Sequence, residues 1–179
     1  MIILQALYFM LPAYCANMAP VFATKIFGKK FNLPLDFGLK YQGKEILGKN
    51  KTWRGLLAGI LVGIATVCLQ AYLEQFGFFK MISIINYEAI DVLAYGFLFG
   101  FGVISADAIK SLFKRRLDIK PGAKWFPWDQ LDFSGGLILI LLVYLPPWYI
   151  FLLSLIISPF LPLASNWIGY KLKLKKVAW

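Results

Sequence analysis

The chain has 179 residues, of which 60% are hydrophobic and 16% charged, with a formal net charge of +10 and a mean hydropathy of +0.68. Soluble domains are about 45–50% apolar, so this composition excludes an ordinary soluble fold and indicates one domain that buries its apolar surface in lipid. The chain has no histidine, which excludes imidazole bases, histidine metal ligands and Ser-His triads.

The first predicted membrane helix covers residues 2–27. A span needs about 20 mostly apolar residues to cross the hydrocarbon core. The opening residues lack the basic region of a cleaved signal peptide, and the first Lys is Lys25, so we expect a retained helix with its N-terminus outside. Pro12, Asn17 and Pro20 interrupt the apolar run, which fits either a broken helix beside a lipid-substrate entry or a kinked packing helix.

Four further apolar segments follow, and we predict helices at 53–73, 89–109, 131–145 and 148–168. The segment 131–145 is shorter than a full span, and Pro146-Pro147 predicts a tight turn after it. The predicted fold class is therefore an all-α integral membrane protein with about five transmembrane helices, and with cytoplasmic loops at about 28–52 and 110–130. Cys15 and Cys68 lie in apolar stretches and are interpreted as packing residues, not as a disulfide.

The cationic residues lie in three clusters that fix the predicted topology. With an odd number of spans, 18 of the 19 Lys and Arg fall on one face, in segments 25–54, 110–124 and 171–176, and only Lys80 falls on the other. The positive-inside rule makes the first face cytoplasmic. We therefore expect a multi-pass protein of the cell membrane with its C-terminus in the cytoplasm. Cations that flank membrane helices favour a membrane surface or an anionic substrate over nucleic acid as partner.

The first loop enters the second helix through a glycine-rich basic run, Gly48-Lys49-Asn50-Lys51-Thr52-Trp53-Arg54-Gly55. Glycine lets backbone N–H groups approach an anion, and a helix N-terminus adds oriented donors and the positive end of its dipole. The run therefore predicts a phosphate cradle, although it is not the Walker A pattern G-x-x-x-x-G-K-[ST]. An ordinary basic anchor beside the membrane is the alternative.

The third predicted helix ends in a polar stretch. Asp107 and Ser111 are four residues apart and share one helix face. Asp107 lies at the edge of an apolar span, where an ionisable residue is costly and usually faces a partner or a polar cavity. Lys114 and Arg115 follow within one turn. We predict that these residues belong to the site; the alternative is that Asp107 only pairs with Lys110 or Lys114.

The second loop ends in two more carboxylates. Asp129 and Asp132 are three residues apart at the start of the fourth predicted helix, where helix capping is the alternative role. Together with Asp107 they suit Mg²⁺, which takes oxygen ligands and shares them with substrate phosphates. The neighbouring aromatic residues either stack on a base or belong to the aromatic belt at the membrane interface; they are Trp125, Phe126 and Trp128.

Residues 111–132 resemble the signature of the phosphatidate cytidylyltransferases. That signature has S-x-x-K-R, a Lys five residues after the Arg, and a terminal D-R-x-D. The matching residues are Ser111, Lys114, Arg115, Lys120, Asp129 and Asp132. Pro121 and Gln130 stand where that family usually has Asp and Arg, and the usual H-G-G is absent.

Those departures fit a narrower branch. The short length, the predicted spans and the motifs PAYCANMAP, PLDFG, GKEILGKNKTWRG and DQLDF look like the CDP-archaeol synthase family, over nearly the whole chain. The resemblance implies that CTP and 2,3-bis-O-geranylgeranylglycerol 1-phosphate give CDP-archaeol and pyrophosphate, with Mg²⁺ as cofactor.

The resemblance also implies roles for individual residues. Asp107, Asp129 and Asp132 would hold the metal ion and, with Lys114, form the catalytic set. The residues implied in binding nucleotide or lipid phosphate are Ser111, Lys114, Arg115 and Lys120. Those assigned to nucleotide binding in the first loop are Lys49, Asn50, Lys51, Thr52 and Arg54.

Three other functions stay open at this point. Diacyl phosphatidate is the alternative lipid substrate, because the ether-linked lipid is implied by the branch alone. A transporter would place charged residues deep in several spans, often in repeated halves, and the chain has neither. A scaffold without enzymatic activity explains the basic loops but not the aspartates at two helix–loop junctions. Release of pyrophosphate from CTP with a lipid phosphate, with and without Mg²⁺, separates the enzyme from the transporter and the scaffold. A panel of ether-linked isoprenoid and diacyl glycerol phosphates separates the two lipid substrates.

Overall fold

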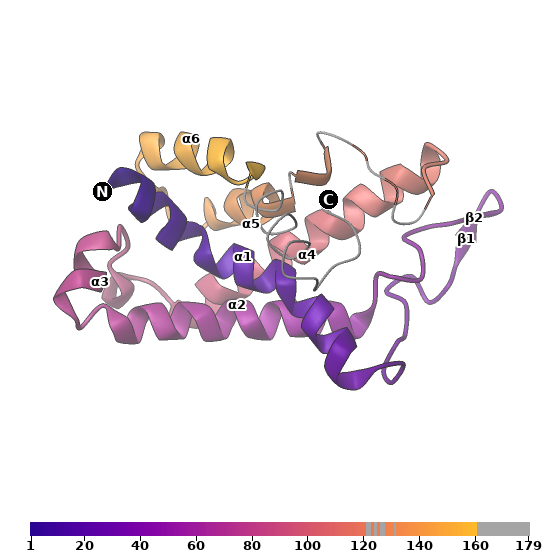
Figure 1. Ribbon diagram of the computed structural model, residues 1–179, viewed down its shortest axis with the longest axis horizontal. Helices are drawn as coiled ribbons and strands as arrows, with labels where there is room; N and C mark the ends of the chain where they lie inside the picture. The colour runs from indigo at the N-terminus through magenta and orange to yellow at the C-terminus, as the bar shows by residue number, and fades with distance from the viewer. Residues whose placement is uncertain (121–122, 124, 126–127, 131, 161–179) are drawn as a thin grey trace, which may run out of the picture.

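The computed structural model describes residues 1–120, 123, 125, 128–130 and 132–160, and only the backbone of residues 130, 132 and 133. Its helices are α1 (Ile2–Phe27), α2 (Trp53–Leu73), α3 (Gly77–Ile82), α4 (Val92–Arg116), α5 (Asp132–Ile140) and α6 (Trp148–Ile157), with the 3-10 turns η1 (Tyr87–Ala89) and η2 (Trp128–Gln130). Because α1, α2 and α4 are long and apolar enough to cross a membrane, the predicted all-α membrane class is confirmed. Figure 1 shows α3 and the β1–β2 hairpin at opposite ends of this bundle.

The first two long helices have the bounds that hydropathy predicts. α1 is helical from Ile2 to Phe27 with Pro12 and Pro20 inside it, so the prolines do not divide it into two helices. α2 begins after Thr52, whose side chain accepts a hydrogen bond from the N–H of Gly55 at 3.2 Å. Thr52 is therefore a helix N-cap, since it pairs with one of the N–H groups that a helix start leaves free.

The third span differs from its predicted bounds, 89–109. α4 begins after Asp91, which caps the N–H groups of Leu93 and Ala94, and it continues to Arg116. The predicted loop 110–130 therefore begins as helix. The helix continues beyond the apolar run. Cations in its last turn interact favourably with the helix dipole, and this turn packs on the hairpin.

The last two predicted helices, 131–145 and 148–168, are shorter in the described residues. α5 ends at Ile140 and turns follow it, while α6 covers Trp148–Ile157. Residues 161–168 lie outside the described part of the chain, so the five-span count and the final helix stay predictions. The short helix α3 and the turn η1, between α2 and α4, were not predicted.

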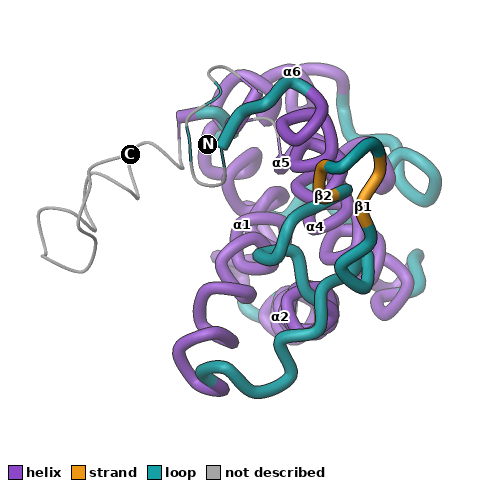
Figure 2. Tube along the Cα trace, turned by 90° about the vertical axis from the view of Figure 1, so that its right-hand side faces the viewer, coloured by secondary structure: helices purple, strands orange, loops and turns teal. Residues whose placement is uncertain are grey.

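Residues 28–52, predicted as a loop, contain a small hairpin. β1 (Lys40–Tyr41) pairs antiparallel with β2 (Lys44–Glu45) across Gln42 and Gly43, which have φ of 52° and 76°. Two central residues with positive φ form the turn that matches the twist of a two-stranded ribbon. Figure 2, which looks onto this end of the molecule, shows the hairpin against α4.

The long helices approach closely where both carry glycine. The α-carbon of Gly100 on α4 faces α2, and a Cβ placed on it would lie 2.6 Å from the carbonyl oxygen of Gly59. Small residues of this kind let membrane helices pack backbone to backbone. The hydrophobic core lies beside this contact and joins α1, α4, α5 and α6 through Phe9, Tyr95, Phe99, Leu137 and Ile150.

Replacing Gly100 by Ala is therefore expected to destabilise the protein by about 1–3 kcal/mol, because the added methyl group forces α2 and α4 apart. Gly77→Ala is the matched control, since a Cβ on Gly77 meets nothing within 4 Å. Thermal unfolding in detergent checks this. Equal melting temperatures for the two variants would contradict the close helix contact.

Candidate functional site

The site predicted from the sequence lies around the last turns of α4. Asp107 on α4 forms ion pairs with Lys51, from the first loop, and with Lys110, one turn further along α4. The nitrogen of Lys110 is 3.4 Å from the Asp107 carboxylate, and the Lys51 ammonium also donates a hydrogen bond to that carboxylate. The two segments predicted to form the site, the first loop and α4, therefore meet at Asp107.

Asp129, from the second loop, binds the same face of α4. Its carboxylate accepts a hydrogen bond from Lys114 at 2.7 Å and one from the N–H of Trp125 at 2.7 Å, and it lies 3.6 Å from Lys110. Lys114 is only 8% exposed and also donates to the carbonyl oxygen of Ala123 at 2.7 Å. Lys114 thus anchors the second loop to the helix.

Lys110 connects these two sets of contacts into one group. Its nitrogen lies within 3.6 Å of both the Asp107 and the Asp129 carboxylate. We call the connected residues the charged network: Lys51, Asp107, Lys110, Lys114 and Asp129. It draws on three separate segments and places three cations around two carboxylates, an arrangement suited to a polyanionic substrate together with a cation.

The pKa of Asp129 is lowered by its partners. Burial acts to raise this pKa, but the Lys114 ammonium, the Trp125 N–H and Lys110 outweigh that effect. A carboxyl group with a lowered folded-state pKa stabilises the folded state above its unfolded pKa of about 3.9, and this stabilisation is lost as the pH falls through the folded value.

Wild-type protein is therefore expected to lose stability below pH of about 4 more steeply than Asp129→Asn, which has no carboxylate to protonate there. Melting temperatures measured in one detergent from pH 3 to 6 check this. Parallel pH profiles for the two proteins would contradict the assigned pKa direction.

The carboxylate donor set suits Mg²⁺ in part. Asp107 and Asp129 offer oxygen ligands on either side of Lys110, and Mg²⁺ usually takes one or two protein carboxylates and completes its shell with water and substrate phosphates. Among the described residues no group of three acidic, Cys or His side chains comes together. The side chain of Asp132, the third predicted ligand, lies outside the described part of the structure.

The predicted phosphate cradle divides into residues with different surroundings. Lys49 and Asn50 are exposed at the loop tip, and Lys51 joins the charged network. Thr52 caps α2, so its hydroxyl is already paired with the N–H of Gly55. Arg54 is different, because its guanidinium is buried against backbone carbonyls of the chain and does not face the charged network.

The other predicted phosphate ligands lie on or after α4. Ser111 is buried at 7% exposure, and Lys120 is exposed beyond the helix end. Arg115 lies beside Gly48: its Cδ would be 4.0 Å from a Cβ on that glycine. The buried Nε of Arg115 has no hydrogen-bond partner among the described residues.

Sequence reasoning missed how the hairpin is held at the end of α4. Arg116 donates hydrogen bonds to the carbonyl oxygens of Tyr41 and Glu45, both at 3.0 Å, and Lys44 pairs with Asp118. Asp36 accepts the N–H groups of Gly38 and Leu47. Burial acts to raise the pKa of Asp36, but these backbone donors lower it overall. The turn-forming Gln42-Gly43 pair was the available sequence signal.

Trp125 and Trp128, predicted either to stack on a base or to lie in the membrane interface, pack on each other. Their ring centroids are 5.8 Å apart, with the rings tilted by 37°, and Trp128 is 52% exposed. The pair lies next to Asp129 and therefore at the edge of the charged network.

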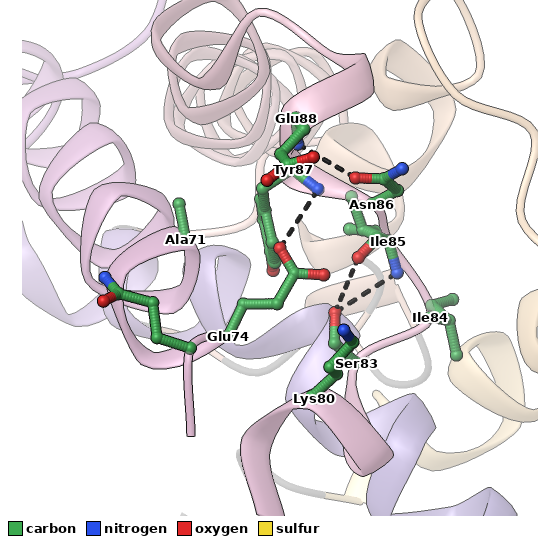
Figure 3. Close-up of a pocket in the computed structure, with 10 residues that line it drawn as sticks. Ala71, Glu74, Lys80, Ser83, Ile84, Ile85, Asn86, Tyr87 and Glu88 are labelled. Carbon is green, nitrogen blue, oxygen red and sulfur yellow. Dashed lines mark hydrogen bonds between the residues drawn. The ribbon is translucent and has the colours of Figure 1, made fainter. Parts of the chain in front are cut away.

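A separate pocket of about 780 Å³ lies at the opposite end of the bundle, around α3 and η1. Figure 3 shows Glu74 accepting the backbone N–H of Tyr87, and Ser83 bonded to Ile85, along its wall. None of the predicted site residues lines this pocket. We therefore place the candidate site at the charged network, where chemically active side chains from three segments meet.

Known proteins similar to this chain match it over nearly its whole length. The family model described as CarS-like CDP-archaeol synthase matches residues 1–179. A CDP-archaeol synthase of Methanospirillum hungatei is 38% identical over 95% of this chain and 100% of its own, and one of Archaeoglobus fulgidus is 35% identical over 99% and 98%. A solved structure described as an intramembrane enzyme for archaeal membrane lipids biosynthesis is 31% identical, has a TM-score of 0.69, and is matched over 92% of this chain and 94% of its own.

Proposed function

The chain belongs to the CDP-archaeol synthase family, and from this membership we propose that it transfers the cytidylyl group of CTP to an ether-linked isoprenoid glycerol phosphate. The products are CDP-archaeol and pyrophosphate. One observation carries the proposal at the level of residues: three cations and two carboxylates from three segments meet at one end of a membrane-embedded bundle. That end can receive a nucleotide from water while the lipid chains stay in the bilayer.

The reaction needs no histidine. An oxygen of the lipid phosphate attacks the α-phosphorus of CTP, and the bond from that phosphorus to the bridging oxygen of the β-phosphate breaks, so that pyrophosphate leaves. A phosphate monoester has a second pKa of about 6 and is already an anionic nucleophile at neutral pH. The protein therefore has to align the two phosphates and neutralise their charge.

The cations of the charged network supply much of the positive charge that neutralises the phosphates. Lys51 binds Asp107 and Lys114 binds Asp129, so each ammonium group is placed where it could donate to a phosphate oxygen beside these carboxylates. Lys49, Ser111, Arg115 and Lys120 are proposed as further phosphate contacts, with Asn50 at the loop tip.

We assign the metal role to the three predicted carboxylates, Asp107, Asp129 and Asp132. A bound Mg²⁺ would neutralise charge on the reacting phosphates. Asp107 and Asp129 both form ion pairs with the ammonium group of Lys110, which supports a cation site shared by the two carboxylates. Turnover that persists after complete removal of divalent metal would contradict this assignment.

The proposed orientation has the N-terminus outside and the charged network on the cytoplasmic face. Most Lys and Arg of the described residues lie at one end of the helix bundle, near the C-terminal ends of α1 and α4 and the start of α2. Lys80 lies at the other end, on α3. The positive-inside rule supports this orientation.

Pyrophosphate release by the purified protein tests the function. With CTP, Mg²⁺ and an ether-linked isoprenoid glycerol phosphate, we expect turnover that falls sharply when ATP replaces CTP, because a snug base pocket rejects a purine. A diacyl glycerol phosphate in the same detergent separates the two lipid classes. No release with either lipid would contradict the proposed function.

A further inference from the structure

Arg54 is a buried cation at a helix end that does not favour it. It lies in the first turn of α2, where the helix dipole is positive and a positive side chain is disfavoured. It is nevertheless only 9% exposed. Something else in the structure must therefore stabilise its charge, because a buried guanidinium is costly unless its donors are paired.

That stabilisation comes from the end of α1. Arg54 donates hydrogen bonds to the carbonyl oxygens of Gly28 at 2.9 Å and Lys30 at 2.6 Å, and to the hydroxyl of Thr24 at 3.0 Å. A longer contact of 3.5 Å reaches the side-chain oxygen of Asn32. Carbonyl groups at and beyond a helix C-terminus attract cations, so Arg54 acts as a cap for α1.

The segment that Arg54 holds is hydrogen-bonded through its backbone to the residues around Lys51. After Asn32, the N–H of Leu35 donates to the carbonyl oxygen of Lys51 at 2.8 Å, and the N–H of Trp53 donates to that of Leu33 at 3.0 Å. The backbone near the start of the loop between α1 and α2 is therefore hydrogen-bonded to the backbone near its end. In Figure 2, α2 is seen end-on with this loop beside it.

We propose that Arg54 is a positioning residue for the reaction and not a phosphate ligand. It fixes the segment after α1, and the backbone pairing of that segment with residues 51–53 holds the Lys51 ammonium on Asp107. This inference rests on the proposed function, and it replaces the nucleotide-binding role that the sequence assigns to Arg54.

The test measures how readily the Lys51 amine reacts with a label when no substrate is present. Purified wild type, Arg54→Lys and Arg54→Gln are acetylated with an amine-reactive ester, and the rate at each lysine is read by mass spectrometry. Both variants are expected to raise the rate at Lys51 about fivefold or more, because Lys51 loses its fixed place on Asp107. Lys114, which is bound to another loop, is expected to keep its rate and is the internal control.

The kinetic arm tests whether this positioning matters for the reaction, while the labelling without substrate separates positioning from direct phosphate binding. Arg54→Lys keeps the positive charge but has no planar fork to reach several acceptors, so kcat/KM for CTP is expected to fall about tenfold or more. Lys29→Gln, which removes an exposed cation from the same loop, is the control and is expected to stay near wild type.

Several results would overturn the inference. They are an unchanged Lys51 rate in both variants, equal increases at Lys51 and Lys114, and full kcat/KM in Arg54→Lys. If the Arg54 variants do not purify folded, Thr24→Val removes one acceptor and leaves Arg54 in place, and it must then raise the Lys51 rate selectively. Failure of this inference is distinguishable from failure of the proposed function. The labelling rates are measured without substrate, and the proposed function is tested by pyrophosphate release from CTP by the wild-type protein.

Discussion

Replacing Asp107 by Asn is expected to lower turnover of CTP by about 10²–10³-fold or more. Asp107 is the point where the first loop meets α4, and its carboxylate binds Lys51 and Lys110. The substitution keeps the shape and removes the charge, so Lys51 loses its counter-ion, Lys110 keeps its ion pair with Asp129, and the proposed metal ion loses a ligand. Pyrophosphate release at saturating CTP and Mg²⁺ measures the effect.

The matched control is Asp91→Asn, the same substitution near the other end of α4. Asp91 caps the helix by accepting the N–H groups of Leu93 and Ala94, and Asn caps equally well, so near-wild-type turnover is expected. Near-wild-type turnover in Asp107→Asn would remove Asp107 from the site. Asp132→Asn is expected to lower turnover by a similar factor, which tests the proposed metal-ligand role of a residue whose side chain lies outside the described structure.

Replacing Lys114 by Met is expected to lower kcat/KM for CTP by about 10²-fold or more, since misplaced catalytic groups have effects of this size. Lys114 is buried and donates to both carboxylate oxygens of Asp129, at 2.7 and 3.0 Å, and to the carbonyl oxygen of Ala123. Without it, Asp129 keeps a carboxylate with fewer partners, and the second loop loses its anchor to α4. Steady-state kinetics and a melting curve together measure the result.

Lys80→Met is the control for that substitution, because Lys80 is an exposed cation on α3 at the other end of the bundle. It is expected to retain wild-type kcat/KM. A folded Lys114→Met protein with wild-type kcat/KM would show that Lys114 serves neither substrate binding nor loop anchoring.

Hydropathy alone predicted the long helices well. α1 and α2 have the predicted bounds, because a segment in lipid must satisfy its backbone hydrogen bonds internally and apolar runs therefore become helices. The same rule failed at the end of α4, where the helix continues for seven residues beyond the predicted end at 109, since contacts with the loops and the helix dipole replace lipid there.

The candidate site was predicted in part. The sequence located Asp107, Lys51, Lys114 and Asp129 as residues able to bind a phosphate or a metal ion, and the structure brings them together through Lys110. The docked hairpin was missed, because its contacts join Arg116 to residues more than seventy positions earlier in the chain.

The sequence by itself determined that this chain is a membrane protein and where α1 and α2 begin and end, because hydropathy and charge act locally along the chain. Only the tertiary structure decided the partner of each cation. Lys51 and Arg54 are three residues apart, yet one faces a carboxylate on α4 and the other the carbonyl groups at the end of α1. The physical reason is that a buried side chain pairs with whatever the packing of distant segments places beside it.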